Sequence, residues 1–532
     1  MMKSKSIAYL LVAAGLTLVS CDDFLDKMPD DRAEINTAEK VTKLLVSAYP
    51  ETTPYLMQEM ASDNVTDNGA EYQKGGLTQE EAYLWKDFTG SENDAPHAVW
   101  NNTFVAVAAA NQALKSIEEL GGGPEFNAQR GEALICRAYS LFMLANCFCM
   151  AYSPETADQY LGLPYPTEPE TTVKPAYSRG TLRQLYDNIQ RDIEAALPLI
   201  DDNLYTVPKY HFNKKAAYAF AARFYLYSQQ WDKAIEAANA VLGTTPEAYM
   251  RDWKYISKMP QDYPSRCDEY ISASSPANLL LMTSTSLLSR YMGASGTGMR
   301  YSHNNSEINS HETFRAPGLW GSYDSAVPLY MATSMFGKDE KVVVSKYGIY
   351  FQYVDKVNGT GYPQAVTVTC SGPEVLLIRA EAYAIKNELD KALADLQVWV
   401  KANAAGNITI TTEDIEALYG EDLSYSEYED GTPRAASDKS TPKKRLHPSG
   451  FSITDETQEA FIHCILHIRR LELFADGRRW EDIKRYGIEI AHKRAGQDDI
   501  ILRKDDPRRA LQLPSDVIAA GLEANPRNLG DD

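Results

Sequence analysis

Two histidines on one predicted helix have the spacing of metal ligands. His463 and His467 stand four positions apart with Glu459 one turn earlier, so the three side chains would share one helix face, as zinc ligands do. No glutamate follows His463 in the order that zinc peptidases use. A stripe of buried, hydrogen-bonded histidines is the favoured interpretation.

A second group of polar residues offers oxygen ligands. Asp63, Asn64, Asp67 and Asn68 carry the carboxylate and amide oxygens that calcium prefers. The alternative is an ordinary polar loop, which we favour, so no metal ion is predicted.

Catalytic arrangements are equally weak. The segment Gly293-Ala-Ser295-Gly lacks the final spacing of a nucleophile elbow. Carboxylate pairs carry no signal for glycosidase chemistry in a chain with 73 Asp and Glu residues. We therefore predict no catalytic residue, no cofactor and no enzymatic activity.

Covalent chemistry is predicted at Cys21. Lys3 and Lys5 precede an apolar run over 7–19 that is too short to span a bilayer, which is the layout of a secretory signal. The run ends in Leu18-Val19-Ser20-Cys21, the pattern of a bacterial lipobox. The sequence predicts a signal peptide at 1–20 and a mature chain anchored to a membrane by acyl chains, such as palmitate, on Cys21.

Composition excludes some partners. The formal net charge of −20 would repel nucleic acid. Tyrosine is abundant, 33 against 15 phenylalanines, so many rings have an apolar face and a hydrogen-bonding tip. Six further cysteines show neither metal spacing nor a disulfide framework, and those at 136, 147 and 149 are expected to be small core residues.

The elements that must position any site are mainly helices. A helix, turn and helix occur at 217–238 and again at 375–396, with a tyrosine and an Asp-Lys-Ala start repeating 158 positions apart. This is the pattern of a tetratricopeptide-type unit, which must stack on neighbours to bury its apolar face. The predicted fold is mostly α, a tetratricopeptide-like superhelix with an irregular, loop-rich subdomain.

Two segments interrupt the helical pattern. The first, at 63–96, is a long irregular stretch, and the second, at 250–370, is rich in Gly, Ser, Tyr and Asn. We divide the mature chain into an amino-terminal helical part at 21–250 and a carboxy-terminal part at 251–532, whose ligand subdomain is 251–370.

With these segments placed, the chain resembles the SusD/RagB family of outer-membrane lipoproteins over nearly its whole length. No single motif decides the resemblance, but their order does. The segments that carry it are Cys21-Asp-Asp-Phe-Leu-Asp, Trp100 to Asn111, Gly131 to Tyr139, Glu374 to Tyr383, Arg469 to Gly487, and Gln512-Leu-Pro514.

The resemblance implies a substrate-capturing lid for a TonB-dependent outer-membrane transporter of the SusC-like kind, importing oligosaccharides or, in some members, peptides. Asp22 and Asp23 resemble the signal that sends such lipoproteins to the cell surface, although a solvated tether is the alternative. In the segment after Arg469, we expect Arg469, Glu472 and Arg478 to be structural, pairing within the stack with buried acids such as Glu381.

Sugar capture needs flat ring faces and groups that hydrogen-bond hydroxyls. The two irregular segments supply both kinds, and functional residues concentrate in loops. Burial as a loop anchor is the alternative for each residue. The predicted ligand-binding residues, led by the two tryptophans, are Trp320, Trp85, Tyr323, Tyr301, Tyr291, Asp87, Arg300, Asn304 and Tyr72.

Three functions remain open from the sequence. The first is a glycan-binding lipoprotein, the second is a RagB-type protein whose polar loops bind extended peptide backbone, and the third is a surface glycoside hydrolase. The net negative charge disfavours strongly acidic ligands such as uronates and sulfated glycans.

Overall fold

The computed structural model describes residues 35–170, 177–260, 262–322, 329–338 and 341–527. The signal peptide, Cys21 and Tyr323 lie outside the described residues. Among the described helices, none is both long enough and apolar enough to cross a membrane.

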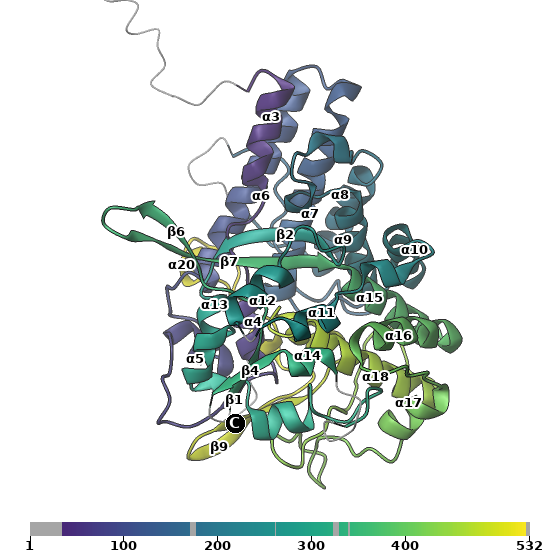
Figure 1. Ribbon diagram of the computed structural model, residues 1–532. Helices are drawn as coiled ribbons and strands as arrows, with labels where there is room; N and C mark the ends of the chain where they lie inside the picture. Colours follow the sequence, from purple (N-terminus) through teal and green to yellow (C-terminus); the bar gives the residue numbers. More distant parts are fainter. Residues whose placement is uncertain (1–34, 171–176, 261, 323–328, 339–340, 528–532) are drawn as a thin grey trace, which may run out of the picture.

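The body is a stack of helical hairpins (Figure 1). Its helices are α3 (Ala38–Leu45), α6 (Pro96–Glu119), α7 (Asn127–Phe148), α8 (Leu182–Ala196), α9 (Lys214–Tyr227), α10 (Trp231–Leu242), α15 (Gly372–Ile385), α16 (Leu389–Asn403), α17 (Thr412–Tyr419), α18 (Glu456–Glu472) and α19 (Arg478–Arg485). Helix α6 packs on α7, α7 on α8, and α9 on α10, and the stack then continues through α10 and α15 into the second half of the chain.

The two repeated hairpins, α9–α10 and α15–α16, have the same turn. Gln229 and Asn387, 158 positions apart, both take positive φ, 61° and 59°. The following amide nitrogen donates to the tyrosine carbonyl at 2.8 Å in both hairpins, Gln230 to Tyr225 and Glu388 to Tyr383. Helix α10 packs along α15, so units far apart in sequence adjoin in the stack, as the repeat predicts.

The segment 250–370 is more ordered than the sequence suggested. It contains a three-stranded antiparallel sheet in the order β2-β7-β6, which crosses the helical body in Figure 1. Its strands are β2 (Asn278–Thr285), β6 (Tyr350–Asp355) and β7 (Thr360–Ser371). The smaller antiparallel pairs are β1 (Thr66–Asp67) with β3 (Tyr301–Ser302), β4 (Met335–Lys338) with β5 (Lys341–Val344), and β8 (Ile490–Arg494) with β9 (Gln497–Leu502).

Short helices fill the connections. The α-helical ones are α4 (Tyr55–Ala61), α5 (Leu77–Tyr83), α11 (Trp253–Lys258), α12 (Tyr263–Tyr270), α13 (Leu288–Tyr291), α14 (Tyr330–Thr333) and α20 (Ser515–Ala519). The remaining turns are η1 (Val46–Ala48), η2 (Pro124–Phe126), η3 (Asp202–Leu204), η4 (Pro208–Tyr210), η5 (Pro246–Tyr249), η6 (Ala294–Gly298), η7 (Asn305–Asn309, a π turn) and η8 (Pro507–Arg509).

One hydrophobic core runs through the stack and under the sheet. All six cysteines after residue 21 are buried and unpaired, which confirms the prediction that those in α7 and beside it are core residues. The arginines of α18 and α19 are structural, as expected. Arg469 lies 3.0 Å from Asp482 and 3.4 Å from Glu381, and Arg478 pairs with Glu481 at 2.8 Å. Glu472 differs, because its carboxylate accepts from the Trp399 indole at 3.1 Å.

Candidate functional site

The two tryptophans predicted to lead the ligand surface are buried, and that prediction is corrected. Trp320 is 2% exposed and packs against Trp399 and His467, with ring centroids 5.8 and 5.2 Å away. Trp85 is 3% exposed, stacks on His492 at 4.2 Å and donates its indole hydrogen to the Ala61 carbonyl at 2.9 Å. Neither ring offers a face to a sugar, so both act as loop anchors.

The structure does bring the two predicted segments together. We call their contact the loop seam, formed by residues 63–76 and 290–304. Strands β1 and β3 pair across it, and Arg300 donates to both carboxylate oxygens of Asp67, at 2.6 and 2.5 Å. In the seam, these predicted polar residues bond to other residues of the same chain and do not face solvent.

The other predicted residues are also engaged. Tyr291 accepts from the Gly76 amide at 2.8 Å, and Tyr301 stacks on Tyr83 at 4.6 Å. The Asn304 side chain donates a hydrogen bond to the Asn68 side chain at 2.8 Å, and Arg527 donates to the Asp87 carboxylate at 2.8 Å. The Lys341 ammonium lies 3.2 Å from the Tyr72 ring centroid. Tyr291 and Tyr301 are buried, whereas Asp87 keeps 54% of its side chain exposed. Ligand binding by Asp87 therefore stays a prediction.

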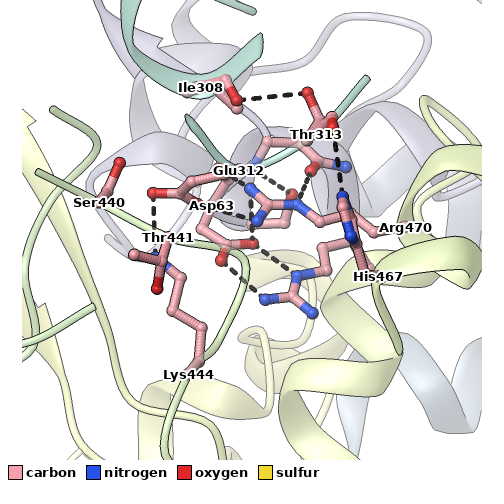
Figure 2. A network of polar contacts seen from close by, with 12 residues as sticks. Asp63, Ile308, Glu312, Thr313, Ser440, Thr441, Lys444, His467 and Arg470 are labelled. Atoms are coloured by element: carbon pink, nitrogen blue, oxygen red, sulfur yellow. Dashed lines mark hydrogen bonds and ion pairs between the residues drawn. The ribbon is translucent and has the colours of Figure 1, made fainter. Parts of the chain in front are cut away.

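Beneath the seam lies a buried ionic cluster, shown in Figure 2. Arg470 contacts Glu312 at 2.8 Å and the Asp63 backbone oxygen at 2.7 Å, while Lys444 lies 3.0 Å from Glu312. Burial would raise the pKa of Asp63, but Arg470 and Arg479 hold it well below its usual value. These charges fix the loops that carry the seam to helices α18 and α19.

The candidate metal ligands are already engaged in hydrogen bonds and ion pairs within the protein. Asp63 and Asp67 are paired with arginines. His463 lies 3.3 Å from Glu459, and His467 bonds Tyr419 and the Thr313 carbonyl. No group of three or more His, Cys, Asp or Glu side chains among the described residues could hold a metal ion.

Open polar surface lies instead in a cleft of about 550 Å³, which we call the hairpin groove. One wall is the face of the β2-β7-β6 sheet, and the other comes from the start of α6 and the segment before α4. The lining residues are Glu51, Thr52, Asn93, Ala98, Asn102, Thr283, Thr285, Gln352, Val354, Tyr362 and Gln364.

The sheet wall is a ladder of amides and hydroxyls ending in an aromatic ring. Strand register places Thr285 opposite Gln364, and Gln352 opposite Tyr362. The Gln364 amide donates to Thr285 and to Gln352, both at 3.1 Å, which orients the ladder. Tyr362 is 53% exposed, so its ring face is open.

Hydrogen bonds hold the helical wall in place, and some of its polar side chains remain available to a ligand. Asp94 accepts from Ser286 and Leu287, at 2.5 and 2.7 Å, and so fixes the loop before α6 to the end of β2. Burial raises the pKa of Asp94 to about 6. Within the described residues no hydrogen bond occupies the side chains of Glu51 or Asn93. Their oxygen and nitrogen atoms are available to hydroxyl groups.

The outer part of the groove depends on a hairpin that projects from the body (Figure 1). Strands β6 and β7 are joined through Asn358-Gly359, with Gly359 at φ 64°. The Asp355 carboxylate accepts from the amides of Val357 and Asn358, at 2.8 and 3.1 Å, and stabilises the turn. The hairpin therefore presents two exposed faces.

Two family models match the chain. The first, a SusD-like family described as starch-binding associating with outer membrane, matches residues 23–226, and the second, the SusD family, matches residues 373–510. Together the matches span well over half of the chain. The chain belongs to the SusD/RagB family. No curated protein matches it.

Solved SusD structures share the fold. A SusD superfamily protein from Bacteroides thetaiotaomicron is 18% identical, with a TM-score of 0.61 over 92% of this chain and 99% of that one. A putative sugar binding protein from Bacteroides vulgatus is 17% identical, with a TM-score of 0.64 over 93% and 100% of the two chains. At this identity the similarity establishes the SusD fold alone.

Sequence reasoning missed the groove residues of this SusD/RagB chain. Asn358-Gly359 between two runs rich in β-branched and aromatic residues is a strong hairpin signal, and it would have located β6 and β7. No local signal shows that Gln352 and Tyr362 face α6, because that wall comes from residues about 250 positions away.

Proposed function

We propose that this protein captures oligosaccharides in the hairpin groove and passes them, chemically unchanged, to a TonB-dependent, SusC-like outer-membrane transporter. The observation that carries the proposal is the open ladder of amide and hydroxyl groups beside the exposed Tyr362 ring. Amides bond sugar hydroxyls, and an aromatic face packs on the C–H groups of a pyranose ring.

The groove suits temporary capture. Its size is within the usual range of ligand clefts, but it is open and mainly polar, so a bound sugar stays largely hydrated. Hydrogen bonds to a sugar replace hydrogen bonds to water, so each gives orientation but only a modest net affinity. A protein that must release its ligand to a transporter needs this balance.

The proposal includes a lipid anchor at Cys21, with Asp22 and Asp23 directing export to the cell surface. The lipobox pattern and the family description of association with the outer membrane support it. Metabolic labelling with palmitate should mark the wild-type protein and not Cys21→Ala. Labelling of both proteins, or of neither, would contradict the anchor.

Affinity electrophoresis through gels containing single neutral polysaccharides tests the capture. At least one polysaccharide should retard the wild-type protein, and incubation should release no oligosaccharide. Release of oligosaccharide would support the hydrolase alternative. Retardation by no member of a broad panel would contradict glycan capture.

Peptide capture is the second candidate, and one observation favours it. Strand β6 is at the edge of its sheet, and the side chains from Phe351 to Val354 are exposed. A peptide could add there as a further strand. Peptide binding that survives Tyr362→Ala would indicate this edge, whereas the sugar proposal uses the sheet face.

A further inference from the structure

We infer that Glu51 makes the hairpin groove selective against acidic glycans, so that its ligands are neutral or amino-bearing oligosaccharides. The inference rests on the proposed function and adds the ligand class and the residue that sets it.

The groove has one charged side chain. Among the described residues that line it, Glu51 is the one acidic side chain, and Lys, Arg and His are absent from the lining. The remaining polar groups are amides and hydroxyls, which bind neutral partners. A carboxylate or sulfate on a ligand would therefore enter without a cation to pair with it.

Glu51 is also held at the groove. Its backbone carbonyl accepts from the Thr285 amide at 2.7 Å, which ties the segment before α4 to the end of β2. The side chain is exposed, and no hydrogen bond or ion pair in the described part of the chain engages its carboxylate. This hydrogen bond fixes the backbone of Glu51, so the segment cannot shift to move the carboxylate away from an acidic ligand.

The acids next to the lining are bound within the protein and leave Glu51 as the carboxylate that faces the groove. Glu92 accepts from the Leu77 amide, Asp94 from the Leu287 amide and Asp355 from the Val357 amide. Lys356 is the nearest cation along the hairpin, and it lies in the exposed turn. Negative potential concentrated in a cleft repels anions and attracts cationic amino groups.

The test uses a matched pair of probes. One probe is a neutral oligosaccharide that retards the wild-type protein, and the other is the same oligosaccharide with its primary hydroxyl groups oxidised to carboxylates. Titration calorimetry at about 0.1 M salt should give the neutral probe an affinity about tenfold higher, the size expected for one unpaired like-charge contact near a protein surface.

Substitution separates charge from lost hydroxyl contacts. Glu51→Gln should lower the ratio of neutral to acidic affinity by about fivefold, because it removes the repelling charge. Glu119→Gln changes the net charge equally, but Glu119 is exposed at the far end of α6, about 25 Å from Asn102. That control should leave the ratio unchanged, since salt screens charges beyond about 10 Å at 0.1 M.

The outcomes distinguish the two claims. Equal binding of both probes, or an unchanged ratio in Glu51→Gln, would overturn the selectivity and leave glycan capture standing. The selectivity would also be overturned if the wild-type protein bound a natural uronate or sulfated glycan and Tyr362→Ala abolished that binding. If no neutral glycan binds, the proposed function fails and this inference fails with it.

Discussion

The loop seam and the hairpin groove contain the same kinds of side chain, tyrosines, asparagines and acids, yet they use them differently. In the seam, Arg300 is held by Asp67 and Tyr301 is stacked on Tyr83. In the groove, no hydrogen bond among the described residues engages the side chains of Glu51 and Asn93, and Tyr362 is half exposed. Residue type therefore does not distinguish the two regions, whereas the hydrogen-bond occupancy of these side chains does.

The largest expected effect is at Trp85, which anchors the predicted segment 63–96 outside the loop seam itself. Trp85→Ala should lower the free energy of unfolding by about 3–5 kcal/mol, because it removes a buried ring and leaves a cavity. Urea denaturation followed by circular dichroism measures it. The milder Trp85→Phe, which stays folded, should bind glycan as the wild type does. Lost binding in a folded Trp85→Phe would return the ligand site to the seam.

The ionic cluster beneath the seam should be nearly as sensitive. Arg470→Met leaves Glu312 and Asp63 buried with fewer partners and should cost about 3–5 kcal/mol in the same denaturation experiment. The matched control is Arg503→Met, which breaks the half-exposed pair with Glu489 and should cost about 0–1 kcal/mol. Equal losses would show that the cluster is not a structural clamp.

Acidification should lower the stability of the fold through two buried histidines, one in the seam and one in α18. Burial lowers the pKa of His303 and of His467 to about 3, and the contacts of both rings suit the neutral form. The unfolded chain takes up protons below pH 6.5 while these folded rings do not, so stability is full above pH 6.5 and is lost as the pH falls towards 3.

Each histidine should cost about 2 kcal/mol by pH 5. The raised pKa of Asp94 works in the opposite direction between about pH 4 and 6. Unfolding free energies at pH 7, 6 and 5 should therefore fall less steeply in His467→Gln than in the wild type. Identical slopes would mean that the His467 ring has the same pKa in the folded and in the unfolded chain.

Substitution of Tyr362 should change the stability least and the glycan affinity most clearly. Tyr362→Ala should reduce glycan affinity about tenfold without shifting the melting temperature, because its ring is exposed and faces the groove. Tyr353→Ala is a matched control on the same hairpin, 54% exposed but outside the groove lining. Similar losses in both variants would place the ligand on the hairpin edge or its other face.

The sequence was sufficient for the stack but not for the site. The 158-residue offset predicted two hairpins whose turns match at Gln229 and Asn387, because local side-chain pattern determines helical hairpins. The sequence also identified the irregular segments 63–96 and 250–370, which do contact each other in the structure. Whether Trp320 faces solvent depends on Trp399 and His467, which come from distant helices, so composition could not decide it.

Hydrogen–deuterium exchange with and without a bound neutral oligosaccharide tests the central claim most directly. The account predicts slower exchange at 350–366 and 93–102, which form the two walls of the hairpin groove, and no change at 290–304. Protection of 63–76 and 290–304 with unchanged exchange in the hairpin would contradict it.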